Sequence, residues 1–119
     1  MKEIAKSRAL KIANILSDKK AQDILIIDIE ELTVIADCFV IASGRSPLQV
    51  RALCDEIEEK LEAEGERVIR KEGYEAARWI VLDYGDILVH IFHKEEREFY
   101  NIERLWEDGT NTIKIESQL

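Results

Sequence analysis

Residues 79–92 of the chain read WIVLDYGDILVHIF, and this stretch decides the fold. Two runs rich in β-branched and apolar residues lie on either side of Gly85 and Asp86. Glycine adopts a positive φ at little steric cost, as a tight turn between two strands requires. The stretch therefore predicts a β-hairpin with a two-residue loop, in which Tyr84 pairs with Ile87.

The two faces of this hairpin differ in composition. Side chains alternate along a strand, so this register places Leu82 opposite Val89 and Ile80 opposite Ile91. That set is apolar and is expected to face the core. The opposite set mixes aromatic, aliphatic and polar groups: Trp79, Val81, Asp83, Leu88, His90 and Phe92. Such a mixture is typical of a docking surface or of a sheet face beneath a helix.

Hydrophobic spacing predicts the elements around the hairpin. A near-continuous apolar run, DILIIDI, indicates a strand in the middle of a sheet that is covered on both faces. Ser46, Pro47 and Gln49 together mark the start of a helix whose outer face is strongly acidic, and residues 43–45 are expected to form the tight turn before it. The predicted elements are helices at 4–18, 46–64 and 94–107 and strands at 23–29, 37–42, 67–71 and the two of the hairpin.

These elements predict an α/β fold, a single domain with a mixed β-sheet of about five strands and three flanking helices. A chain of 119 residues is long enough to bury a core without disulfides or metal. Residues 1–109 are expected to form the domain. Residues 110–119 are expected to form a polar C-terminal tail that is loose or only weakly added, because Ile113 and Ile115 are its only apolar anchors.

Composition and charge limit the classes of function. The net charge of −8 and the pI near 4.8 argue against a protein that wraps nucleic acid and favour a basic protein partner. Cys38 and Cys54 lie in apolar segments and are expected to be buried free thiols in a reducing cytosol. The first 18 residues are too charged for a signal peptide, and no apolar run approaches the roughly 20 residues that span a bilayer. We therefore expect a cytoplasmic protein without a membrane segment.

A few residues fall in patterns that catalytic and metal-binding sites use. Ser43 and Gly44, just before a helix, could cradle a phosphate in the manner of a nucleotidyltransferase. That chemistry needs alternating acidic residues on a following strand, but residues 53–61 are helical by pattern. His90 and His93 are expected on opposite faces, and neither cysteine has a basic neighbour that would activate it. We therefore predict no enzyme activity, no metal and no cofactor, while Trp79 fits a binding anchor and a core residue equally well.

Three segments resemble the ribosomal silencing factor (iojap-like) family: ADCFVIASGRS at 36–46, WIVLDYGDILVHIF at 79–92 and REFYNIERLWED at 97–108. The resemblance runs from the first helix to Asp108. It implies a nucleotidyltransferase-like fold that lacks the catalytic carboxylates. It also implies binding to the large ribosomal subunit through its ribosomal protein fourteen (uL-fourteen), which blocks joining of the small subunit and damps translation when nutrients are limiting. Organelle relatives help the large subunit to assemble.

The resemblance also implies which residues bind the partner. Trp79, Asp83, Tyr84 and His90 match the family's motif, and their neighbours complete a predicted partner-binding set of Trp79, Val81, Asp83, Tyr84, Leu88 and His90. The mechanism would be steric occlusion without a reaction. An exposed Trp79 face would also allow a homodimer off the ribosome.

Three other hypotheses remain open. The first is a degenerate nucleotidyltransferase-like enzyme with residual nucleotide binding, and the second is a large-subunit assembly factor. The third is direct binding of ribosomal RNA, and the acidic charge balance makes it the weakest of the three. The basic side chains that would contact the RNA are Lys19, Lys20, Arg67, Arg70 and Lys71.

Overall fold

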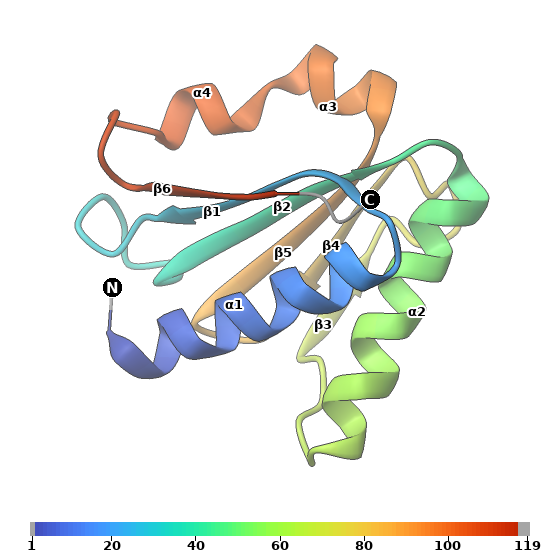
Figure 1. The fold of residues 1–119 in the computed structure, drawn as a ribbon, viewed down its shortest axis with the longest axis horizontal. Coiled ribbons are helices and arrows are strands. Elements are labelled where there is room, and N and C mark those ends of the chain that lie inside the picture. Colours follow the sequence, from blue (N-terminus) through green and yellow to red (C-terminus); the bar gives the residue numbers. More distant parts are fainter. Residues whose placement is uncertain (1, 117–119) are drawn as a thin grey trace.

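The computed structural model describes residues 2–116 and shows one mixed sheet between two layers of helices (Figure 1). Helices α1 and α2 cover one face of the sheet, and the short helices α3 and α4 lie on the other. In chain order the elements are α1 (Glu3–Asp18), β1 (Gln22–Asp28), β2 (Cys38–Gly44), α2 (Pro47–Ala63), β3 (Arg70–Glu72), β4 (Trp79–Asp83), β5 (Ile87–His93), α3 (Lys94–Tyr100), α4 (Ile102–Trp106) and β6 (Thr112–Ile115).

The strand order is β3-β4-β5-β2-β1-β6, with β2 and β5 parallel and every other neighbouring pair antiparallel. The hairpin of β4 and β5 has the predicted register, because Leu82 pairs with Val89 and Ile80 with Ile91. The backbone N–H of Tyr84 donates to the carbonyl of Ile87 at 2.9 Å, which closes the predicted two-residue loop. The predicted α/β class and mixed sheet are confirmed.

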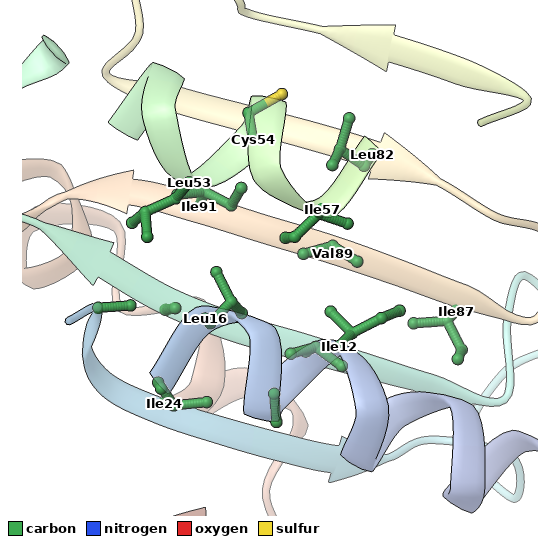
Figure 2. Packing of buried hydrophobic residues seen from close by; sticks show 14 of the residues in the cluster. Ile12, Leu16, Ile24, Leu53, Cys54, Ile57, Leu82, Ile87, Val89 and Ile91 are labelled. Atoms are coloured by element: carbon green, nitrogen blue, oxygen red, sulfur yellow. The ribbon is translucent and has the colours of Figure 1, made fainter. Parts of the chain in front are cut away.

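The larger core lies between the sheet and helices α1 and α2. Figure 2 shows the aliphatic side chains of the two helices packed on alternate residues of the strands. The N-terminus of α2 is capped as predicted, because Ser46 Oγ accepts a hydrogen bond from Gln49 N at 3.1 Å. Gln49 Oε1 in turn accepts from the backbone N–H of Arg45. The N-terminal cap stabilises the start of α2, and the buried apolar side chains of the helix hold it against the sheet.

A smaller, more aromatic core lies on the opposite face of the sheet, beneath α3 and α4. Its buried members are Leu25, Ile27, Ile29, Ala36, Phe39, Ile41 and Phe92. The indole of Trp106 meets the Phe39 ring edge-on at 5.2 Å, which ties α4 to the middle of the sheet.

The predicted single helix over 94–107 is wrong in one respect. Asn101 has φ 45° and ψ 51°, and this left-handed residue ends α3 and begins α4. Asparagine tolerates this conformation better than most residues with a Cβ. Because of this change of direction the apolar side chains of the segment do not all face the sheet, and Phe99 is 80% exposed and Leu105 78% exposed.

The sheet has six strands, one more than predicted. Residues 112–115 form β6, which pairs with β1 through Ile24–Ile115 and Ile26–Ile113. The side-chain amide of Asn111 donates to the carbonyls of Asp28 and Trp106, both at 2.9 Å, and this aligns β6 with the edge of β1. Part of the predicted tail therefore belongs to the sheet, and residues 117–119 of that tail lie outside the described residues.

Two boundaries also differ from the predictions. Ser43 and Gly44, expected in a turn, are the last residues of β2 and pair with Phe92 and His93 of β5. The strand predicted at 67–71 forms only at 70–72. In both places the partner strand, which the local sequence does not reveal, decides where the ladder ends.

Candidate functional site

One part of the sheet is left partly open by the helices. Helix α3 packs over β5 and β2, so the β4 side of this face has less cover. Four of the predicted partner-binding residues lie there with half-buried side chains, namely Trp79, Val81, Asp83 and Leu88. We call these four residues the open strip. They share one face because they alternate along β4 and pair across the hairpin with β5.

The indole of Trp79 is held by aromatic neighbours. It stacks on Phe92 with 4.8 Å between ring centroids and 24° between planes, and it lies 4.9 Å from the ring of Tyr100. Its Nε1–H donates to Nδ1 of His90 at 3.1 Å. Trp79 is thus a partly open residue whose inner surface belongs to the aromatic core, which combines the two alternatives left open by the sequence.

Two of the six predicted contact residues are buried. His90 is 7% exposed and Tyr84 6% exposed, so direct contact of these side chains with a partner conflicts with the structure. Tyr84 lies in the core beneath α1 and α2, where burial raises the pKa of its phenol well above the usual range. Burial lowers the pKa of His90 to about 4, so this side chain is neutral at physiological pH.

Asp83 is the acidic member of the open strip. One of its carboxylate oxygens accepts a hydrogen bond from the backbone N–H of Gly85 at 2.8 Å, which fixes the side chain beside the hairpin turn. Gly85 has φ +91°, a conformation that favours glycine. The turn therefore positions a negative charge next to the apolar surface of Val81 and Leu88.

An open pocket of about 610 Å³ adjoins the strip at Trp79. Phe99 and Tyr100 contribute aromatic side chains to it, and the other lining residues are Gly73, Ala76, Arg78, Trp79, Glu95 and Glu96. The aromatic rings suit an apolar or cationic side chain from a partner, while the carboxylates of Glu95 and Glu96 are already bonded by Arg78. Sequence reasoning missed Phe99 and Tyr100 as surface residues, and the one available signal was an asparagine in the middle of a helical pattern.

The polar groups that were expected to cradle a phosphate already form hydrogen bonds within the protein. Ser43 is buried, and its hydroxyl accepts a hydrogen bond from Arg97 Nη1 at 2.9 Å. Arg97 is in turn paired with Glu103 at 2.6 Å. At the start of α2, Ser46 already occupies the backbone N–H of Gln49. These contacts stabilise the end of β2 and the start of α2. We therefore interpret Ser43 and Ser46 as structural residues.

Two groups of side chains have spacings that could hold a metal ion, and both are already paired with other groups. They are Cys54, Asp55 and Glu58, and His93, Glu95 and Glu96. Lys71 lies 3.1 Å from Glu58, Tyr74 donates to Asp55 at 2.9 Å, and Arg78 bonds both Glu95 and Glu96. Burial raises the pKa of the Cys54 thiol to about 12, so its thiolate is scarce at neutral pH.

Two of the five basic residues of the RNA hypothesis are paired with acidic side chains. Lys19 pairs with Glu56 at 3.4 Å and Lys71 with Glu58 at 3.1 Å.

Cys38 and Cys54 are buried free thiols, as predicted. Among residues 2–116, no helix combines the length and the apolar character needed to cross a membrane.

Comparison with known proteins gives a consistent picture over nearly the whole chain. The family described as "Ribosomal silencing factor during starvation" matches residues 2–119. The ribosomal silencing factor of Bacillus subtilis is 46% identical over 92 residues, which cover 77% of this chain and 78% of that protein. The corresponding protein of Halalkalibacterium halodurans is 42% identical and covers 87% of both chains.

Solved structures extend the likeness to three dimensions. A crystal structure of a protein from Chromobacterium violaceum has a TM-score of 0.80 at 32% identity, covering 88% of this chain and 90% of that one. A crystal structure from Bacillus halodurans has a TM-score of 0.78 at 37% identity, covering 92% of this chain and 99% of that one. The more specific likeness to nucleotidyltransferases stays a prediction.

Proposed function

This chain belongs to the ribosomal silencing factor family, and from that premise we propose that it represses translation by occupying the large ribosomal subunit. In this proposal the domain binds ribosomal protein fourteen of the large subunit (uL-fourteen) and blocks the small subunit from joining. It acts in the cytoplasm by steric occlusion and converts no substrate. Its central hairpin, paired along its length and buried on its inner face, suits a surface that must hold its shape against a large particle.

The open strip is the observation that carries this proposal. An aromatic side chain, two aliphatic side chains and a carboxylate are presented together on strands whose other face is fully buried. Partly exposed aromatic residues that become desolvated on binding often supply most of the affinity of an interface. Asp83 would pair with a lysine or arginine of the partner, and the net charge of −8 would steer the approach to a basic surface.

Replacement of Trp79 tests the proposed surface. Trp79→Ala should weaken binding to purified large subunits by about 2 kcal/mol or more, roughly 30-fold, because it removes the largest anchor. Binding is measured by co-sedimentation over a range of protein concentrations. Leu48→Ala is the matched control, because Leu48 is an exposed apolar residue of α2, on the other face of the sheet.

The control variant should pellet like the parent. The proposed surface is wrong if Trp79→Ala keeps the parent's circular dichroism and melting temperature and also pellets with unchanged affinity. A subunit-joining assay completes the test, since a protein that binds without slowing joining would contradict the occlusion mechanism.

A second candidate function is assistance in large-subunit assembly. One relative, from mouse, is called "Mitochondrial assembly of ribosomal large subunit protein 1"; it is 29% identical, and the match covers 43% of that protein. Deletion of the gene separates the two functions. Repression predicts normal large subunits and excess joined ribosomes during starvation, whereas assembly predicts immature large particles during growth.

A further inference from the structure

The contact between His90 and Trp79 links a buried residue to the proposed binding surface. His90 lies on β5 beneath the helices, and its ring meets Phe39 edge-on at 4.7 Å. Its Nδ1 is 3.1 Å from Nε1 of Trp79 on the neighbouring strand. His90 is too deeply buried to touch a partner, while Trp79 is half-buried and reaches the surface.

The chemistry of the two rings determines the direction of this hydrogen bond. The indole nitrogen of tryptophan only donates, so Nδ1 of His90 must accept and the neutral imidazole must carry its proton on Nε2. Nε2 is buried and has no hydrogen-bond partner among the described residues. A buried donor without a partner costs free energy. A phenylalanine would fill the same space beside Phe39 without that cost, so packing alone does not account for a histidine here.

Ring stacking alone leaves the orientation of the indole open. Contact with Phe92 sets the plane of the Trp79 ring, but a flip of the indole about χ2 would keep the same plane and move Nε1 to the other side. Without an acceptor in the protein, the Nε1–H would be more stable turned toward water, where it can donate a hydrogen bond. The acceptor on His90 holds the edge that bears Nε1 toward the sheet and thereby selects the edge that is presented outward.

We propose that His90 is a positioning residue, which orients the Trp79 indole for partner binding through the Nε1–Nδ1 hydrogen bond. This inference rests on the proposed function, because it assigns Trp79 to the contact with the large subunit. His90 itself makes no contact with the partner.

Two replacements of His90 separate positioning from packing. His90→Phe keeps an aromatic ring but removes the acceptor, and His90→Asn keeps an acceptor at the position of Nδ1 but leaves a cavity. Positioning predicts that His90→Phe binds large subunits about 3- to 10-fold more weakly, the equivalent of one hydrogen bond, while His90→Asn stays within about twofold of the parent. A purely structural role predicts the reverse order, because His90→Phe should be the more stable of the two variants.

The indole proton reports the hydrogen bond directly. Both tryptophans carry such a proton, so the Nε1–H resonance of Trp79 is assigned in a Trp106→Phe background, where Phe39 still meets an aromatic ring. Hydrogen exchange of this proton should be slow in the parent and in His90→Asn and at least several-fold faster in His90→Phe. Should His90→Phe fail to fold, His90→Leu removes the acceptor instead and should show the same faster exchange and the same weaker binding.

The outcomes distinguish this inference from the function on which it rests. Parental binding by Trp79→Ala would overturn the proposed surface and the binding part of this inference together. Weak binding by Trp79→Ala with parental binding and exchange in His90→Phe would overturn the positioning of Trp79 alone. Weak binding by both, with recovery in His90→Asn, would support it.

Discussion

The two faces of the hairpin use the same two strands for different purposes. Toward α1 and α2 the side chains are aliphatic and fully buried, as with Ile80, Leu82, Val89 and Ile91. Toward α3 and α4 they are a mixture of aromatic, aliphatic and polar groups, and the open strip is only half covered. Because side chains alternate along a strand, neighbouring residues in the sequence belong to different faces, and a register slip of one residue would exchange the two sets.

The helices on the two faces differ as much as the side chains. The buried face is covered by α1, with 16 residues, and α2, with 17, whereas the aromatic face is covered by helices of 7 and 5 residues. Helices that short are marginal in water and depend on tertiary contacts. Arg97 supplies one such contact, because it joins α3 to Ser43 of β2 and to Glu103 of α4. The comparison indicates that folding stability comes mainly from the first face and that the second face is suited to binding.

Alanine replacements at two adjacent residues give the strongest test of the difference in stability between the two faces. Leu82→Ala should lower the free energy of unfolding by about 4 kcal/mol, because it opens a cavity in the aliphatic core. Val81→Ala, one residue earlier on the half-open face, should cost less than about 1 kcal/mol. Both are measured by urea unfolding at equilibrium. Similar losses in the two variants would contradict the division of labour between the faces.

Acid should destabilise the aromatic face through His90. Burial lowers the pKa of His90 from the ordinary 6.5 to about 4, so the unfolded chain takes up a proton at a higher pH than the folded one. The neutral histidine's contribution to stability is therefore complete above pH 6.5, is lost as the pH falls through 4, and amounts to about 3 kcal/mol. The test is the difference in unfolding free energy between the parent and His90→Phe from pH 7 to pH 4.

That difference isolates His90 from the many carboxylates, which titrate in both proteins. It should shift in favour of His90→Phe as the pH falls. A difference that stays constant with pH would show that His90 titrates in the folded protein as it does in the unfolded chain.

Local patterns predicted the hairpin, its register and the helix start at Ser46 because each depends on neighbouring residues. A two-residue loop and strict alternation leave one register for Ile80 and Leu82, and Ser46 caps through a group only three residues away. The edge strand at 112–115 was missed because it depends on pairing with β1, about 90 residues earlier, to which its own sequence gives no clue.

The candidate binding surface was predicted less completely than the fold. Alternation correctly placed Trp79, Val81 and Asp83 on one face, but it could not show how far α3 extends over that face. His90 shares their face and is nevertheless buried, because β5 lies nearer the centre of the sheet than β4. Tyr84 follows the last residue of β4, and its side chain enters the opposite core.

Replacements of Asn101, where α3 ends and α4 begins, should have the smallest effect, and they test whether two separate helices are needed to cover the aromatic face. Asn101 is left-handed with φ 45°, so Asn101→Ala should lower the free energy of unfolding by about 1 kcal/mol through backbone strain. Asn101→Gly should match the parent to within about 0.5 kcal/mol, because glycine adopts this conformation without a Cβ clash. Thermal unfolding measures both variants, and Trp106 fluorescence in a Trp79→Phe background reports whether α4 keeps its contact with Phe39. Equal stability of the alanine and glycine variants would mean that residue 101 need not be left-handed, and that a continuous helix could cover this face equally well.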